Sequence, residues 1–361
     1  MMQSKACSKS IYVAANSYLK YQEATDPNSA SLFFPEETVS AKEQLAHVAK
    51  QLKAVVNGEN NTKSYTILDS DGKMHQEHLP SDTPYKIEYK SILQRHMRLD
   101  HEIYKEDAGA GPSVRSIAYI NYGVLPQSDP EELDRLAELR NRLDELDKQW
   151  EDSKAAKAIT EFLADHGKYM KTVTKVVGIG LGNPGQKLLA KRVESSYFQH
   201  LTLCHIAREI SKVQENDNVK IFVQDPNYTE LSRNVIIDVS SLDKYYNIQI
   251  VDDPDGFLMM DDQTIVFHCH LLFDIADIAL DVSGEHKLAG LFGAKIGQDH
   301  QKEIEGKILD SDTTMWQLGK MNSSKKCNWA RSCKELIMEP TEENETWYGE
   351  GTHFYIRLRQ S

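Results

Sequence analysis

Short apolar runs alternate with longer amphipathic segments through the second half of the chain. This pattern predicts strands at 173–178, 219–223, 248–251, 264–268 and 288–292, and helices at 186–213, 229–244 and 273–282. Regular alternation of strands and helices is typical of a parallel sheet covered by helices. We therefore predict an α/β, Rossmann-like fold, with a mostly parallel sheet, helices on both faces, and a last antiparallel strand at 352–358 on the sheet edge.

The first part of the chain has a less regular pattern, which predicts a separate α+β region. Apolar residues recur at helical spacing over 40–56, a strand at 64–68 leads into the turn Asp69–Gly72, and a second helix is predicted over Tyr85–His101. A short strand follows at 117–122. The resulting division is an α+β N-terminal region at 1–127, a helical connector at 128–167, and a Rossmann-like domain with a C-terminal tail at 168–361.

The connector contains the clearest amphipathic helix. Ser128 and Glu131 have the spacing of a capping box, and Pro130 fits the first turn. Large apolar residues then recur in steps of three and four: Leu136, Leu139, Leu143, Leu146 and Trp150. The stripe indicates either a coiled coil that dimerises through 133–150 or a helix packed on its own domain. We favour the second, because coiled coils normally extend over three or four heptads.

Composition narrows the class of protein. The 361 residues include 40% hydrophobic and 27% charged residues, with a net charge of −13. That sign argues against a global nucleic-acid footprint but leaves room for a local basic patch. The five scattered cysteines favour reduced thiols, and no apolar run reaches the roughly 18 residues of a membrane span. We expect a soluble cytoplasmic or nuclear protein without a membrane partner.

The glycine-rich turn after the predicted strand at 173–178 is the main candidate site. Gly178, Gly180, Gly182, Asn183 and Gly185 follow a β-branched run and precede a helical pattern, as in a dinucleotide fingerprint. Backbone N–H groups of such a turn can hold a phosphate or carboxylate, or border an adenosine. Pro184 within the turn departs from the fingerprint. A purely structural tight turn is the alternative, and the residues do not identify a cofactor.

Acidic residues follow the next two predicted strands. Asp225 lies at a position where an Asp commonly accepts hydrogen bonds from a ribose or an amine, and the alternative is a turn-forming Asp-Pro pair. Asp253 and Asp255 belong to a group of acids within 252–262 that could bind a metal or a guanidinium group. Acidic turns are also common without a ligand, and we favour that interpretation.

Two further groups of residues have both chemical and structural interpretations. His268 and His270 flank Cys269 and would share one face of a strand, but one strand supplies too few ligands, so we predict no metal site. Basic residues near the C-terminus alternate with tryptophans, a composition that can bind RNA but is more often a solvated loop. They are Lys320, Lys325, Lys326, Arg331 and Lys334, with Trp316 and Trp329.

Three motifs together resemble the "sensitivity to red light reduced"-like domain family over about 150–295. They are Val177–Gly180 with its turn, Gln224–Pro226, and Thr264–Cys269, while Asp253–Phe257 resembles the fungal branch. The sequence Phe-His-Cys-His at 267–270 departs from the Pro-His-Cys of plant and animal members. The resemblance implies a regulatory protein, in a family associated with light and clock signalling, haem metabolism and growth.

Two functional hypotheses follow. The first is an intracellular regulatory protein that binds a small ligand over the glycine turn through Gly180, Gly182, Asn183 and Asp225. The second is a tRNA-dependent, arginine-containing cyclodipeptide synthase of fungal secondary metabolism, which the resemblance suggests is related to this branch. It would use Asp253, Asp255 or His268 for acid–base chemistry and aminoacyl-tRNA as a partner. A partner-binding scaffold built on the leucine stripe is a third alternative.

Overall fold

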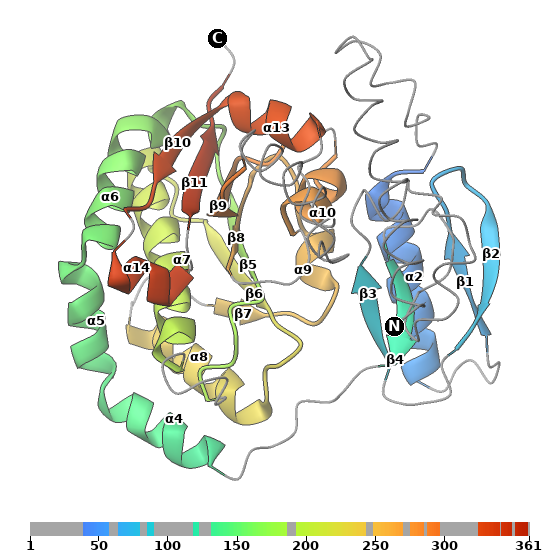
Figure 1. Ribbon diagram of the computed structural model, residues 1–361, viewed down its shortest axis with the longest axis horizontal. Coiled ribbons are helices and arrows are strands. Elements are labelled where there is room, and N and C mark those ends of the chain that lie inside the picture. The colour runs from blue at the N-terminus through green and yellow to red at the C-terminus, as the bar shows by residue number, and fades with distance from the viewer. Residues whose placement is uncertain are drawn as a thin grey trace, which may run out of the picture. The chain divides into compact units, whose positions relative to one another are not determined.

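The computed structural model describes residues 39–57, 64–79, 85–89, 118–122, 131–185, 193–242, 248–269, 275–284, 287–296, 324–339, 341–348 and 351–359 (Figure 1). The chain divides into two compact units. One consists of Met1–Gly123, Leu272–Ile278 and Gly297–Ser324, and the other of Val124–Leu271, Ala279–Ile296 and Lys325–Ser361. The division at 127 and 167 expected from the sequence stays a prediction.

The described residues of the first unit up to Tyr122 form one helix and two antiparallel strand pairs. Helix α2 (Ala41–Val56) begins after Ser40, whose hydroxyl accepts from the Glu43 backbone N–H while the Glu43 carboxylate accepts from the Ser40 N–H. This reciprocal cap satisfies two amides that the first helical turn leaves without partners. Strands β1 (Ser64–Leu68) and β2 (Met74–His78) form the predicted hairpin, and β3 (Tyr85–Tyr89) pairs with β4 (Ala118–Tyr122).

The predicted helix over Tyr85–His101 is wrong where the structure describes it, because Tyr85–Tyr89 is a strand. Its sequence, Tyr-Lys-Ile-Glu-Tyr, alternates large apolar with charged residues, which is the period of a strand and not of a helix. The other residues of that prediction, from 90 to 101, lie outside the described residues.

The second unit is built on a seven-stranded sheet with the order β10-β11-β9-β8-β5-β6-β7. Strand β11 is antiparallel to both of its neighbours, and the other pairs are parallel. The strands are β5 (Lys175–Ile179), β6 (Lys220–Gln224), β7 (Ile248–Ile250), β8 (Thr264–His268), β9 (Gly290–Ala294), β10 (Cys333–Ile337) and β11 (Thr352–Arg357). The mostly parallel Rossmann-like sheet predicted from the alternating pattern is confirmed.

Strand β11 is antiparallel as predicted, but it does not lie at the edge. It is inserted between β9 and β10, and β10 forms the edge instead. The sequence analysis predicted no strand at Cys333–Ile337 because the surrounding region, 300–345, is polar and poorly periodic, and the strand itself contains Lys334 and Glu335. An edge strand tolerates such residues, since much of its surface faces solvent.

Helices cover both faces of this sheet. Phe354 and Tyr355 are adjacent on β11 and therefore point to opposite faces. Phe354 contacts Phe162, which belongs to helix α6, whereas Tyr355 contacts Trp329 of α13. The helices are α4 (Glu132–Asn141), α5 (Leu143–Asp152), α6 (Lys154–His166), α7 (Val193–Gln214), α8 (Glu230–Leu242), α9 (Asp255–Leu258), α10 (Ile275–Val282), α13 (Ser324–Arg331) and α14 (Glu342–Tyr348).

The predicted single helix of 128–150 is divided in two, because α4 ends at Asn141 and α5 begins at Leu143. The first described helix of this unit, α4, begins at Glu132. The capping box predicted at Ser128, with Pro130, lies outside the described residues and stays a prediction.

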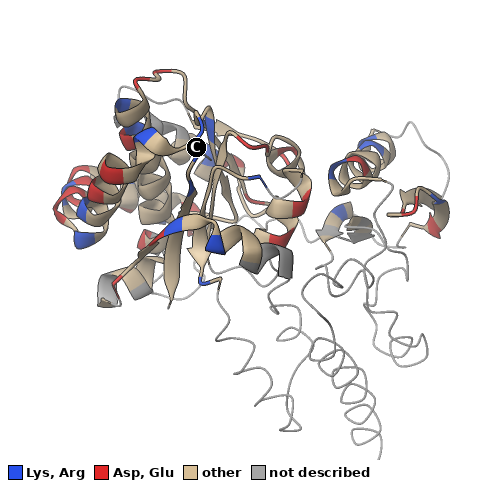
Figure 2. Cartoon of the chain, turned by 90° about the horizontal axis from the view of Figure 1, so that it is seen from above, with Lys and Arg blue, Asp and Glu red and all other residues tan. Residues whose placement is uncertain are grey.

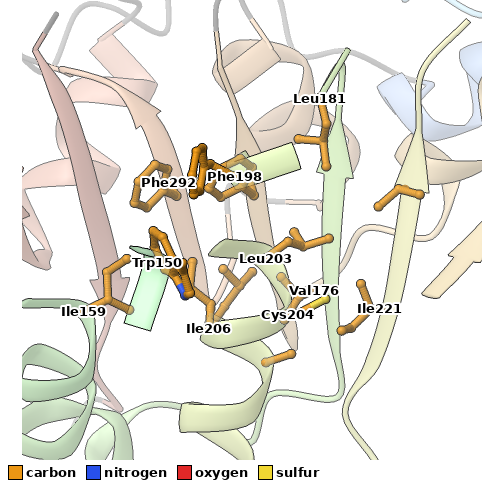
Figure 3. Close-up of a cluster of buried hydrophobic side chains, with 14 of the residues drawn as sticks. Trp150, Ile159, Val176, Leu181, Phe198, Leu203, Cys204, Ile206, Ile221 and Phe292 are labelled. Carbon is orange, nitrogen blue, oxygen red and sulfur yellow. The ribbon is translucent and has the colours of Figure 1, made fainter. Parts of the chain in front are cut away.

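The leucine stripe belongs to the hydrophobic core of its own chain. Leu136, Leu139, Leu143, Leu146 and Trp150 are all buried in one cluster with residues of the sheet and of α7. Figure 3 shows Trp150 near Phe292 and Ile206, and Leu181 beyond the end of β5 at the margin of the same cluster. The burial of these side chains favours the packed-helix interpretation over a coiled coil.

Charged residues of both signs are interspersed on the outer helices of the sheet-bearing unit (Figure 2). Arg142, which lies between α4 and α5, pairs with Glu145 of α5 and with Glu194 of α7. None of the described helices has the length and apolar character needed to cross a bilayer.

Candidate functional site

The strand order reverses at β5, which places the glycine turn at a topological switch point. Strands β6 and β7 lie on one side of β5, and β8 and β9 lie on the other. Right-handed crossovers then carry the connections after β5 and after β8 to opposite faces, which opens a crevice at the carboxyl ends of these two strands. Ile179 is in register with His268 across this point, so the turn and His268 are neighbours.

Two of the predicted glycines adopt conformations that favour glycine. Gly180 has φ = 67° and Gly182 has φ = 78°, both in the left-handed region. Gly178 lies within β5, and a Cβ there would overlap the side chain of Leu181, which folds back beneath the turn. Gly178 therefore serves close packing inside the site rather than its surface.

The backbone amides of the turn are already hydrogen-bonded within the protein. Gly180 N donates to the Gln224 carbonyl at 2.8 Å, and Gly182 N donates to Asp225 Oδ2 at 2.7 Å. Gly185 N donates to Asn183 Oδ1 at 2.8 Å. Three of the donors that a phosphate would require are thus engaged.

Asp225 connects this turn with the loop after β6. Its Oδ1 accepts from Asn227 N at 2.8 Å, while its Oδ2 accepts from Gly182 N. Burial raises the pKa of the Asp225 carboxyl, and the two amide hydrogen bonds oppose that shift. Asp225 therefore holds two loops together at the carboxyl edge, where the sequence predicted a ligand contact.

Replacing Asp225 with alanine is expected to lower the free energy of unfolding by about 2 kcal/mol, because two amides lose their acceptor. Asp225→Asn keeps a carbonyl oxygen and should cost less than half as much. Urea unfolding of both variants followed by circular dichroism measures the difference. Equal losses would show that hydrogen bonding by this side chain does not stabilise the loops.

Helix α4 closes the far end of the turn. The buried carboxylate of Glu132 accepts from Asn183 Nδ2 at 3.0 Å and from Thr229 Oγ1 at 2.5 Å. Arg135 Nε donates to the Gly185 carbonyl at 2.8 Å. A Cβ on Gly185 would come within 2.8 Å of both Glu132 and Leu136, so this glycine allows the helix to approach closely.

Helix α7 presents polar side chains to the back of the turn. Ser196 Oγ donates to the Gly182 carbonyl at 2.7 Å. His200 Nδ1 lies 2.7 Å from the Ser196 carbonyl, which can only accept, so Nδ1 carries the proton and Nε2 accepts from the Tyr228 hydroxyl at 2.8 Å. Full burial lowers the pKa of His200 to about 4, which keeps the imidazole neutral.

Gln224 links the end of β6 to the loop that contains two predicted catalytic residues. Its Nε2 donates to Asp253 Oδ1 at 2.8 Å, and its Oε1 accepts from Gly256 N at 2.7 Å. Asp255 is the first residue of α9. Asp253 and Asp255 therefore lie near the carboxyl edge, on a loop that a strand residue fixes in place.

The acids of 252–262 do not form one group. Asp252 pairs with Arg233 near the carboxyl edge. Asp261 pairs with Lys175 and Asp262 with Lys171, at the amino ends of β5 and β8. The hydrogen bonds from Lys175 and neighbouring groups lower the pKa of Asp261 despite partial burial. A guanidinium pocket made jointly by these acids is therefore not formed.

His268 ends β8 and is buried against the next strand. A Cβ on Gly293 would overlap its imidazole ring, so the ring occupies space that only glycine leaves open. Gly293 in turn is in register with His353 on β11, whose Nδ1 lies 2.7 Å from Glu335 Oε1. His270, the predicted companion of His268, lies outside the described residues.

Trp329, the described tryptophan among the basic residues near the C-terminus, is not exposed. This side chain is buried against Tyr355, where it cannot stack on a base. Arg331 and Lys334 are exposed, whereas Trp316 and Lys320 lie outside the described residues. Within the described ranges, no group of three or more His, Cys, Asp or Glu side chains is placed to hold a metal ion.

The sequence analysis did not identify several residues that shape this site: Glu132, Ser196, His200, Tyr228 and Thr229. Most are polar residues within helices or loops, and their burial depends on contacts between distant segments. One signal was present: α7 combines many polar residues with a length that suggests a central helix, so some of them had to be buried.

The comparisons with known proteins give one family and several structures. A sequence profile described as the SRR1 domain matches residues 143–346. No curated protein matches the chain. A methyltransferase from Geobacter sulfurreducens is similar at 18% identity, covering 65% of this chain and 94% of that chain, with a TM-score of 0.29. SAH-bound Podospora anserina methyltransferase PaMTH1 is similar at 10% identity, covering 64% and 89%, with a TM-score of 0.30.

Proposed function

The chain belongs to the SRR1 domain family, and from this premise we propose that it is a regulatory protein that binds a small ligand at the carboxyl edge of its sheet. The match confirms the family predicted from the glycine turn, Gln224–Pro226 and Thr264–Cys269. The fungal branch, the regulatory role and a location in the cytoplasm or nucleus belong to the proposal.

The observation that carries the proposal is the reversal of strand order beside the glycine turn. Ligands of open α/β sheets bind in the crevice outside the carboxyl ends of the strands at such a point. Gly180 and Gly182 follow β5 at this point, and His268 ends the neighbouring strand. Asp225, at the end of β6, supplies a carboxylate on the other side of the turn.

The ligand is expected to contact side chains and the open parts of the glycine backbone. Each oxygen of Asp225 already accepts one amide N–H, but a carboxylate oxygen has two lone pairs. The side chain of Asn227 also donates to this carboxylate, so one of its four acceptor positions stays available for a ligand hydroxyl or amine. Asn183 is committed to Glu132, Gly185 and Asn227, so it acts by shaping the turn.

The structure gives no reason to prefer aminoacyl transfer. The acidic residues that would bind a guanidinium group are divided between the two edges of the sheet. Trp329 is buried, and the described part of the basic cluster therefore lacks the stacking surface that motivated an RNA partner. Ligand binding at the glycine turn is the function that the described residues support best.

A thermal-shift screen of nucleosides, nucleotides, adenosyl compounds and haem tests the proposal. A ligand at 100 times its Kd should stabilise the protein by about 2.7 kcal/mol. Asp225→Asn should weaken the shift, whereas Asp217→Asn, an exposed change just before the same strand at the opposite edge, should leave it intact. Absence of stabilisation by every compound would count against a site at this turn.

A further inference from the structure

Two buried carboxylates contact the glycine turn, and three of its backbone N–H groups already have acceptors within the protein. Asp225 lies against Gly182, and Glu132 lies against Asn183 and Gly185. The N–H groups of Gly180, Gly182 and Gly185 all donate to acceptors within the protein. In a dinucleotide site the same amides and the helix N-terminus would face the pyrophosphate.

We propose that this site, if it binds a ligand as proposed above, selects a nucleoside without a phosphate near the turn. An anionic group there would replace internal hydrogen bonds and approach two carboxylates in a region of low solvent access. Like charges in such surroundings repel more strongly than in water. A neutral or cationic ligand avoids this repulsion.

The position of Asp225 indicates why the ligand would be a nucleoside. An acid at the carboxyl end of the second strand accepts hydrogen bonds from ribose hydroxyls in Rossmann-type sites. Asp225 follows β6, the second strand of this sheet in chain order, and its carboxylate retains one acceptor position beside the hydrogen bonds from Gly182 and Asn227. A ribose hydroxyl matches that acceptor, and a 5′-phosphate directed at the turn would not.

The basic group in contact with the described turn is Arg135, which is held by two partners. Its Nε donates to the Gly185 carbonyl at 2.8 Å, and its Nη1 pairs with Glu131 at 3.2 Å. One guanidinium therefore lies beside the turn together with the two carboxylates of Glu132 and Asp225.

Matched ligand pairs test the inference on the full-length protein. Adenosine, guanosine, cytidine and uridine are each compared with their 5′-monophosphate by isothermal titration calorimetry at constant ionic strength. At least one nucleoside is expected to bind tenfold or more tightly than its monophosphate. Equal or tighter binding of the monophosphates would overturn the inference while leaving ligand binding in place. Failure of all eight compounds to bind would overturn the inference together with the proposed site.

Charge-neutral variants separate electrostatic selection from shape. Glu132→Gln keeps the oxygen that accepts from Asn183 and Thr229 but removes the charge. The tenfold preference should narrow to threefold or less in this variant. Glu138→Gln removes the same charge from an exposed position on the same helix and should retain the preference. An unchanged preference in Glu132→Gln, with an unchanged melting temperature, would show that the carboxylate is not responsible.

Discussion

Replacement of Trp150 by alanine is expected to lower the free energy of unfolding by about 3–5 kcal/mol. The side chain is 3% exposed and lies at the centre of the cluster that joins α5 to the sheet. The centroid of its ring lies 5.5 Å from that of His205, in an edge-on arrangement, and 5.9 Å from that of Trp347. Alanine would leave a cavity that the surrounding helices cannot fill by small movements. Guanidinium unfolding followed by circular dichroism measures the loss.

The adjoining helix of the same connector provides a matched control. Leu133 is a large apolar residue of α4, but it is 59% exposed. Leu133→Ala should change stability by less than about 0.5 kcal/mol, as surface substitutions usually do. If Leu133→Ala were the more damaging change, or if Trp150→Ala dissociated an oligomer in light scattering without unfolding it, the stripe would serve assembly and not the core.

Acidification from pH 7 to pH 4.5 is expected to cost stability through His200. Burial lowers its pKa in the folded protein to about 4, from 6.5 in the unfolded chain. Between these values the unfolded chain binds the extra proton, so stability is complete above pH 6.5 and is lost as the pH falls toward 4. The difference corresponds to about 3 kcal/mol at most. Urea unfolding at several pH values measures the slope.

The variant His200→Gln removes the titrating group and should flatten this dependence, although its stability at pH 7 will be lower. Tyr228→Phe is the matched control, because it removes the hydroxyl that donates to His200 Nε2 and leaves the buried imidazole in place. Tyr228→Phe should retain most of the slope. Burial also lowers the pKa of His205 to about 4, so this residue contributes the same pH dependence to the unchanged protein and to both variants. An unchanged slope in His200→Gln would contradict the assignment.

The local sequence pattern was sufficient to predict strands that are rich in β-branched and aromatic residues. Thr264–His268 is a β-branched and aromatic run with a turn before it, and the structure has a strand with these bounds. Lys175–Ile179 and Lys220–Gln224 lie within two residues of their predicted ends. The sequence predicted a mostly parallel sheet but not the order of its strands. It does not show on which side of β5 each later strand is added.

Cys333–Ile337 shows where the same reasoning stops. It has no clear alternation of apolar and polar residues, and it forms a strand because β11 offers it a hydrogen-bonding edge. Strand β11 pairs on its other side with β9. A contact between segments far apart in the chain determines this element, and composition cannot report such a contact.

The glycine turn was predictable from the sequence, but its hydrogen bonding was not. Closely spaced glycines after a strand indicated a turn with positive φ, and Gly180 and Gly182 have that conformation. The expectation that their amides would be available to a ligand depended on what lay above them. Asp225 approaches from another strand and takes the Gly182 N–H, and Glu132 reaches the turn from a helix some fifty residues earlier.

The insertion of β11 between β9 and β10 has a consequence for the synthesis of the protein. During translation β10 emerges before the strand that must hold it, and one side of β9 stays without hydrogen-bond partners until Thr352–Arg357 has left the ribosome. Loss of the chain from Thr352 onward would therefore remove β11 and leave β10 without the strand that joins it to the sheet. The protein would then expose unpaired edges on both β9 and β10, which cellular quality control can recognise.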